Sequence, residues 1–262
     1  MTATRDFSTI SPSANSLLVM RAQTGLPFAR QAAELLLGAD GVAAEIARLT
    51  ALAGADLRRA HFQDRYRSID TLLAESGATR VLEIAGGLSF RGLDLAQRQP
   101  VVYLDTDLPA MAETKARIVA ALDAGPLVGD LRVRALNALD AEAFHATVAE
   151  FPAGPFAIVN EGLLMYLDAD EKRRLAAHIR DALIARGGVW ITADIYLRCE
   201  TNGRIGQDER LRAFLAAHKV EEQKFESRAE AEAFFTDTGL AIQRRLTRSP
   251  DAIRETWVLA PA

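Results

Sequence analysis

The sequence predicts a doubly wound α/β fold with a mostly parallel sheet. After Gly77, short apolar strands alternate with amphipathic helices, which is typical of a parallel sheet with helices on both faces. Before that point, residues 28–73 follow a helical pattern, with apolar residues at three- and four-residue steps. Near the end of the chain, two strands are joined by a loop so short that only an antiparallel pair can form.

The composition supports a single large α/β domain with a helical addition. The chain has 262 residues, of which 49% are apolar, and a formal net charge of −4. A nucleic-acid-binding protein usually carries a basic excess, so that class is not expected. Cys199 is the only cysteine, so an internal disulfide is excluded and a cysteine-based zinc site is not expected. Neither a signal peptide nor a membrane span is predicted, and we expect a cytoplasmic protein without membrane partners.

The helical N-terminal region, residues 1–76, is expected to form a cap on the core. Gly38 and Gly54 interrupt its helical pattern. Residues 77–262 then form the α/β core. The segment at about residues 197–226, after the fifth strand, is longer than a simple crossover requires, so we expect it to form a lid together with the N-terminal helices.

Seven strands are predicted in the core, five of them in the alternating part. Those five are RVLEIA (80–85), VVYLD (101–105), LRVRAL (131–136), FAIVN (156–160) and GVWITADIY (188–196). The helices between them cover about residues 90–97, 109–122, 141–150 and 168–186. Pro109 suits a first helical turn, and the glycine pair 187–188 suits a helix end. A further helix ends at Gly239, and the strands AIQRRLTR (241–248) and RETWVLAP (254–261) form the terminal hairpin.

The turn formed by Ala85, Gly86 and Gly87 is the first candidate for a binding site. It follows the first strand, where a change in strand order opens a crevice for ligands. Asp105 and Asp107 lie about twenty residues further on, the spacing at which an acidic side chain reaches ribose hydroxyls. A tight turn without a ligand is the alternative reading of the glycines alone.

The residues after the turn distinguish two kinds of cofactor. A dinucleotide site requires a third glycine, so that the helix N-terminus can approach a pyrophosphate. Here Gly87 is followed by Leu88, Ser89 and Phe90, and the bulk of Phe90 argues against that pattern. S-adenosylmethionine has no phosphate and needs only the close backbone approach. The turn therefore favours S-adenosylmethionine, and a nucleotide-linked oxidoreductase is a distant alternative.

Four segments, in chain order, carry a family resemblance. They are HFQDRYRSIDTLL, EIAGG, VVYLDTDLPAMAETK and VNEGLLMYLD. Together they resemble the leucine carboxyl methyltransferase family, including its bacterial branch of small-molecule O-methyltransferases that act on polyketide carboxyl groups. The resemblance covers roughly residues 64–186. It implies a class I methyltransferase with a Rossmann-like sheet and S-adenosylmethionine as cofactor.

The resemblance assigns the charged cofactor contacts. Arg65 would bind the methionine carboxylate, a role suited to a bidentate guanidinium, with Arg21 assisting. Arg67 takes this role if the register differs by two residues. Glu161 would face the amino group of the cofactor, and Asp107, with Asp105 close behind, would bind the ribose.

The remaining contacts come from backbone and adenine-side positions. The resemblance places these at Glu83, Ala85, Gly86, Gly87, Asn137 and Ala138. Ala85 replaces a glycine that is usual in the family, and Ser89 and Asn137 replace aspartates. As structural alternatives, Asp107 could cap the following helix and Asn137 could be a turn residue.

Methyl transfer is an in-line displacement, so the protein mainly has to align the nucleophile and exclude water. A carboxylate nucleophile needs no base, whereas a hydroxyl benefits from one. Tyr166 and Tyr196 are predicted beside the carboxyl ends of the fourth and fifth strands, where they could orient the acceptor or simply pack. The histidines lie on predicted helices and are expected at the surface. They are His61, His145, His178 and His218.

The sequence thus predicts an S-adenosylmethionine-dependent O-methyltransferase that acts on a carboxylate or hydroxyl of a small molecule, such as a secondary metabolite. It assigns no catalytic residue and no metal. Two alternatives stay open: a methyltransferase for the C-terminal carboxylate of a protein, and a non-catalytic protein that binds S-adenosylmethionine.

Overall fold

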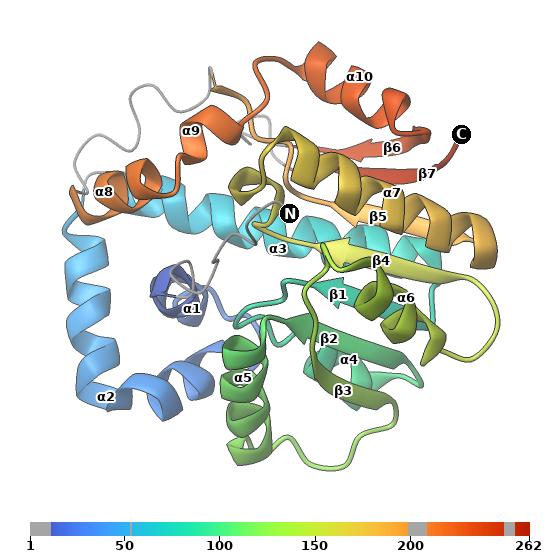
Figure 1. Cartoon of the computed structure of the whole chain (residues 1–262). Coiled ribbons are helices and arrows are strands. Elements are labelled where there is room, and N and C mark those ends of the chain that lie inside the picture. Colours follow the sequence, from blue (N-terminus) through green and yellow to red (C-terminus); the bar gives the residue numbers. More distant parts are fainter. Residues whose placement is uncertain (1–11, 53, 199–208, 249–254) are drawn as a thin grey trace.

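The computed structural model of the chain describes residues 12–52, 54–198, 209–248 and 255–262. Figure 1 shows a central sheet with helices around it. The described strands form one seven-stranded sheet in the order β3-β2-β1-β4-β5-β7-β6. They are β1 (Arg80–Ile84), β2 (Val102–Asp107), β3 (Asp130–Ala135), β4 (Phe156–Asn160), β5 (Gly188–Thr192), β6 (Leu240–Leu246) and β7 (Thr256–Pro261).

The strand directions match the prediction. Strands β1 to β5 pair in parallel, and β7 runs antiparallel to both β5 and β6. The strand order reverses between β1 and β4, and this switch point is where ligands bind in open α/β sheets. The predicted doubly wound sheet with a terminal antiparallel hairpin is therefore confirmed.

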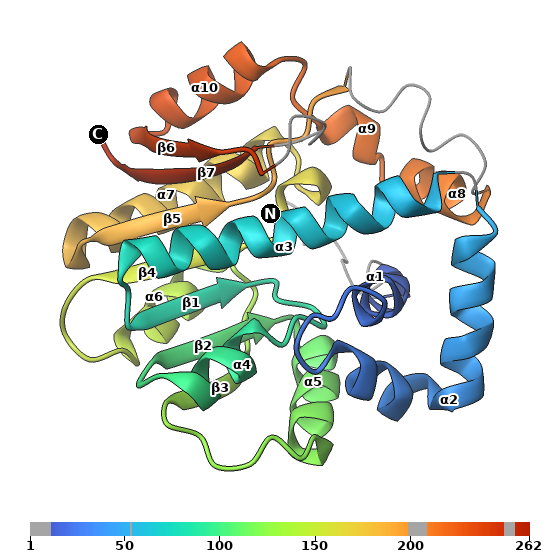
Figure 2. The same ribbon diagram turned by 180° about the vertical axis from the view of Figure 1, so that it is seen from behind.

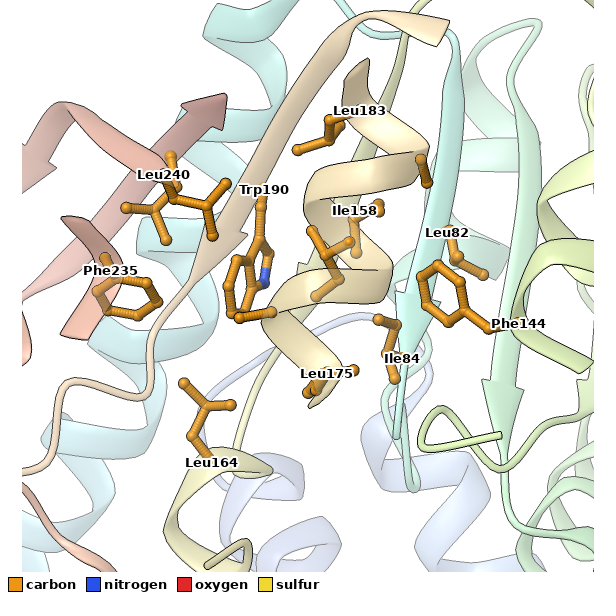
Figure 3. Close-up of a cluster of buried hydrophobic side chains, with 14 of the residues drawn as sticks. Leu82, Ile84, Phe144, Ile158, Leu164, Leu175, Leu183, Trp190, Phe235 and Leu240 are labelled. Carbon is orange, nitrogen blue, oxygen red and sulfur yellow. The ribbon is translucent and has the colours of Figure 1, made fainter. Parts of the chain in front are cut away.

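Helices cover both faces of the sheet. One face is covered by α3 (Ala55–Ser76) and α4 (Arg91–Arg98), which bury apolar residues against β1, β4 and β5. The other is covered by α6 (Ala141–Ala149), α7 (Ala169–Arg186) and α10 (Arg228–Asp237). Figure 3 shows this second core, in which Trp190 of β5 lies between Phe235 of α10 and Ile158 of β4.

The N-terminal helices form a third packed region with part of the core. The helices α1 (Pro12–Ala22), α2 (Ala29–Thr50) and α5 (Pro109–Ala121) share one apolar cluster with Leu88 and Phe90, which directly follow the glycine turn. A kink at Gly38, whose φ is 72°, bends α2. Phe90 thus packs toward the cap. Figures 1 and 2 show α1 and α2 beyond the carboxyl ends of the parallel strands.

The division into a cap and a core stays a prediction, because α3 contributes to both. Its residues Ile69, Leu72 and Leu73 pack against the sheet, while Tyr66 belongs to the cluster of α1 and α2.

The fifth strand is shorter than predicted. It ends at Thr192 rather than Tyr196, because the amides of Asp194 and Tyr196 find acceptors close by in the chain. The amide of Asp194 donates to the Thr192 hydroxyl (3.3 Å), and the amide of Tyr196 donates to the Asp194 carbonyl (3.0 Å). The placement of His218 on a helix is also wrong, since it lies in the turn between α8 (Glu209–Ala217) and α9 (Val220–Gln223).

The two ends of the predicted lid segment lie side by side. Leu197 forms a bridge with Phe225, and the amide of Arg198 donates to the Phe225 carbonyl (2.9 Å). Between these ends, α8 and α9 lie at the same end of the sheet as α1 and α2, beyond the carboxyl ends of the parallel strands (Figure 2). Residues 199–208 of the lid, which include Cys199, and the hairpin loop 249–254 lie outside the described residues. Within the described part of the chain, no helix has the length and apolar character of a membrane span.

Candidate functional site

The glycine turn is less buried than the residues on either side of it. Ala85, Gly86 and Gly87 are half-buried, whereas residues 81–84 before them and 88–90 after them are buried. The Gly86 amide donates to the carbonyl of Thr106 on β2 (2.9 Å), which holds the turn at the carboxyl ends of β1 and β2. Ala85 adopts a left-handed conformation with φ of 52°, which disfavours a side chain and explains why a glycine is usual at this position.

The two glycines have different reasons to lack a side chain. A Cβ on Gly86 would lie 2.5 Å from Oδ1 of Asp105 and 3.0 Å from Nζ of Lys115, so no larger residue fits. A Cβ on Gly87 would meet no heavy atom within 4 Å, but its φ of +50° favours glycine. The backbone at Gly87 therefore faces open space, while Gly86 packs against the buried side chains of Asp105 and Lys115.

Asp107 fastens the turn to the end of β2. Its Oδ2 accepts a hydrogen bond from the Gly87 amide (2.7 Å), and its Oδ1 accepts one from the Leu108 amide (2.7 Å). Burial raises the pKa of Asp107, and these two hydrogen bonds oppose that rise. An ionised carboxylate has about four acceptor sites, so Asp107 retains acceptor capacity for a ligand.

Asp105 lies under the turn and pairs with Lys115 of α5. The carboxylate Oδ2 and the ammonium nitrogen are 2.5 Å apart, and both side chains are buried. Burial raises the pKa of Asp105 to about 7, although the charge of Lys115 acts in the opposite direction. Oδ1 of Asp105 has no hydrogen-bond partner within the described part of the chain. The side chains of this pair pack directly against Gly86 of the turn.

Glu161, the residue directly after β4, lies at the centre of a group of three arginines. Its Oε1 accepts hydrogen bonds from Arg21 of α1 (2.8 Å) and Arg65 of α3 (2.9 Å), and its Oε2 accepts one from Arg91 of α4 (3.1 Å). The Glu161 side chain is only 3% exposed. Burial alone would raise the pKa of Glu161, but the three guanidinium groups hold it well below its usual range. Glu161 is therefore ionised at neutral pH.

The two candidate arginines of α3 have different surroundings. Arg65 is buried against Glu161, and its Nη1 donates to the hydroxyl of Tyr196, whereas Arg67 is exposed. Arg21, named as a helper, is the second partner of Glu161. Tyr196 is thus in contact with the arginine predicted to bind the cofactor.

Arg91 was missed by sequence reasoning. It is the first residue of α4, where a cation is unfavourable to the helix dipole, and this was the available signal. Its Nε donates to Asp70 (2.7 Å) and its Nη1 donates to Glu83, which also accepts a hydrogen bond from the Tyr103 hydroxyl (2.9 Å). Glu83, predicted as a cofactor contact, is therefore bound to Arg91 and Tyr103.

Asp194 was also missed, although an acidic residue in the apolar run ITADIY was a signal. Its carboxylate accepts hydrogen bonds from the amides of Gly162 (2.6 Å) and Leu163 (2.6 Å) and from Nδ2 of Asn160 (2.6 Å). These contacts fix the loop that carries Glu161. A buried carboxylate with this many donors is a strong local constraint.

The adenine-side residues lie next to the end of β2. The Leu136 amide donates to the Asp107 carbonyl (2.8 Å), so the loop with Asn137 and Ala138 begins beside the predicted ribose site. Oδ1 of Asn137 accepts a hydrogen bond from the Leu139 amide (3.1 Å), as in a turn.

Two further contacts involve histidines. The Ala138 carbonyl lies 3.1 Å from Nδ1 of His178. Tyr166, in a short 3-10 helix, η2 (Leu164–Tyr166), packs edge-on against Phe214 (6.2 Å between centroids) and His218 (6.3 Å) of the lid segment. Across the described residues, no group of three or more histidine, cysteine, aspartate or glutamate side chains is placed to hold a metal ion.

The sheet order, the terminal antiparallel hairpin and a glycine turn at the switch point define the class I methyltransferase fold. The sequence model of leucine carboxyl methyltransferases matches residues 11–180, well over half of the chain. The chain therefore belongs to the leucine carboxyl methyltransferase family, and the predicted family is confirmed.

Relatives in sequence agree with this assignment. The chain is 33% identical over 136 residues to a Mycolicibacterium smegmatis protein that is provisionally named an S-adenosyl-L-methionine-dependent methyltransferase. This covers 50% of the chain and 42% of the relative. A Frankia alni protein with the same kind of name is 36% identical over 118 residues, covering 45% of the chain and 37% of the relative. The chain thus spans about half, or less, of the curated relatives it matches.

Solved structures share the fold at low identity. TnmH has a TM-score of 0.53 and 16% identity, and covers 97% of this chain and 69% of its own. The mitomycin 7-O-methyltransferase MmcR has a TM-score of 0.52 and 16% identity, covering 93% and 60%. Magnesium protoporphyrin IX methyltransferase from Synechocystis PCC 6803, with bound SAH, has a TM-score of 0.52 and 11% identity, covering 80% and 88%. Together with the family, these matches confirm S-adenosylmethionine as the expected cofactor.

Proposed function

We propose that this protein is an S-adenosylmethionine-dependent O-methyltransferase that acts on a carboxylate or hydroxyl of a small molecule. The observation that carries the proposal is the buried carboxylate of Glu161 with its arginines, next to a glycine turn at the switch point of the sheet. This arrangement offers a positive charge for the carboxylate and a negative charge for the ammonium group of an amino-acid ligand.

The described residues fit the cofactor in three places. The methionine part has one ammonium and one carboxylate group, which match Glu161 and Arg65, and each such contact is a charge-assisted hydrogen bond. The free acceptor sites of Asp107 suit ribose hydroxyls. The open space beside Gly87 allows a ligand to approach the backbone closely.

When bound, S-adenosylmethionine supplies an electrophilic methyl group on its sulfonium. The residues of this chain would hold the cofactor, align an oxygen nucleophile with that methyl group and exclude water, because alignment accounts for most of the catalysis in such a displacement. Tyr166 and Tyr196 follow β4 and β5 and are the candidates for contact with the acceptor. The hydroxyl of Tyr196 is bound to Arg65, so Tyr196 would also place the methyl acceptor next to the bound cofactor.

We favour a carboxylate as the acceptor, because a carboxylate is ionised at neutral pH and needs no base. The family resemblance favours the same group. Under this proposal, Tyr166→Phe and Tyr196→Phe should lower turnover modestly. A hydroxyl acceptor would instead require a base that contributes about 10²–10⁴-fold.

Isotope transfer tests this proposal. The purified protein is incubated with S-adenosylmethionine that carries a labelled methyl group and with a panel of small carboxylic acids and phenols, and the products are analysed by mass spectrometry before and after treatment with base. Label in a base-labile methyl ester supports the carboxylate. Label in a base-stable ether would contradict the carboxylate preference, and label only on nitrogen or carbon would contradict O-methylation.

A further inference from the structure

Arg91 has no assigned role, yet it is the most connected charged side chain around Glu161. It is only 1% exposed and binds three carboxylates, which belong to Asp70, Glu83 and Glu161. These come from three separate parts of the fold: α3, β1 and the loop after β4. The guanidinium also lies over the ring of Tyr66, 4.1 Å from its centroid.

The two oxygens of Glu161 bind arginines from different helices. Oε1 faces Arg21 and Arg65, which come from α1 and α3, whereas Oε2 is held by Arg91 from α4. A cofactor carboxylate that binds Arg65 competes with Oε1 for this arginine. It would not compete for Arg91, which binds the other oxygen, Oε2.

We propose that Arg91 is a positioning residue for the amino-acid end of the cofactor, acting through Glu161. This inference rests on the proposed function. Arg91 holds Oε2 of Glu161, so that Oε1 stays directed toward the cap when Arg65 exchanges its carboxylate for that of the cofactor. Oε1 then becomes available to the cofactor ammonium.

The shape of the guanidinium explains why arginine is needed here. Its Nε, Nη1 and Nη2 donate to Asp70, Glu83 and Glu161 respectively, so each nitrogen has a separate carboxylate. A lysine supplies the same charge at a single point and cannot keep three carboxylates at fixed directions. The position at the first residue of α4 is unfavourable for a cation, and the surrounding carboxylates compensate for this.

Binding of two ligands to the Arg91→Lys variant tests the inference. The ligands are S-adenosylhomocysteine, which has the amino-acid end, and 5′-methylthioadenosine, which shares the adenosine part and lacks it. Calorimetry should show at least about a tenfold loss of affinity for S-adenosylhomocysteine, whereas the affinity for 5′-methylthioadenosine should change less than about twofold. The second ligand also shows that the variant is folded.

The matched control is Arg98→Lys, the same substitution on the same helix. Arg98 is exposed and pairs with Asp94 within α4, so both affinities should stay unchanged. A milder second variant, Asp70→Asn, removes the partner of Nε and should cause a smaller loss that again affects only S-adenosylhomocysteine.

The possible outcomes distinguish the inference from the proposed function. If Arg91→Lys weakens both ligands equally, or neither, while the wild type binds both, the positioning role is refuted and the proposed function stands. If the wild type binds neither ligand, the proposed function fails and the inference fails with it.

Discussion

Replacing Glu161 with glutamine removes the negative charge on which three arginines converge. The substitution keeps the size of the side chain, so it tests charge rather than packing. Glu161 is 3% exposed, and its contacts to Arg21, Arg65 and Arg91 are 2.8, 2.9 and 3.1 Å long. Breaking a buried ion pair by removing one partner costs about 3–5 kcal/mol, because the remaining charges stay buried.

We therefore expect Glu161→Gln to lower the free energy of unfolding by about 3–5 kcal/mol at pH 7. At about 2–4 °C per kcal/mol for a chain of roughly this size, the midpoint of thermal unfolding should fall by about 6–20 °C. Urea unfolding of the ligand-free protein, followed by circular dichroism, measures the first quantity directly.

The effect should depend on pH in a defined direction. The folded state holds the pKa of Glu161 well below its ordinary value of 4.5, mainly because three guanidinium groups outweigh burial. The stabilisation is complete above the unfolded pKa and is lost as the pH falls through the folded pKa. The difference between the wild type and Glu161→Gln should thus be constant above about pH 5 and shrink in acid.

Glu75→Gln is the matched control. Glu75 pairs with Arg244 at 3.1 Å, but both side chains are largely exposed, so the loss should be below about 1 kcal/mol. If Glu161→Gln cost no more than this control, the three arginine contacts would not stabilise the fold in the way described here.

Three other predictions test separate parts of the site. Arg65→Ala should weaken binding of S-adenosylhomocysteine by about 2–5 kcal/mol in calorimetry, and Arg67→Ala, on the exposed side of α3, should have little effect; the reverse order would contradict the assigned register. Ala85→Gly should raise the free energy of unfolding by about 1 kcal/mol, because it relieves a left-handed conformation, and a decrease would contradict that reason. Asp194→Asn should lower it by about 2–3 kcal/mol, because a neutral amide cannot accept all the donors that bind the carboxylate; an unchanged value would argue against the role of Asp194 in holding the loop after β4.

The sequence predicted those features that depend on local patterns. The alternation of strands and helices, the glycine turn and the short terminal loop each occupy a few neighbouring residues, so their structure follows from periodicity and turn chemistry. Asp107 was identified by its spacing from the glycine turn and by the family resemblance, and Glu161 by the resemblance and by its place at a strand end, where an unpaired carboxylate is costly. Arg65 was placed by the family resemblance.

The contacts between these residues could not be predicted, because the partners are distant in sequence, and Arg21 was named only as a helper of Arg65. Arg21 lies 140 positions from Glu161, and Asp194 lies about 30 positions from the loop that it holds. No local pattern indicates that three arginines from α1, α3 and α4 meet at one carboxylate. The early end of β5 has a different, local cause, since the amide of Asp194 donates to the hydroxyl of Thr192 instead of continuing the strand ladder.

Direct binding of the cofactor tests the central claim. Calorimetry of the wild-type protein should show binding of S-adenosylmethionine and S-adenosylhomocysteine at one site per chain, and no binding of NAD at the same concentrations. Tight binding of NAD without any response to the methyl donor or its product would contradict the account of the glycine turn, Asp107 and Glu161 given above.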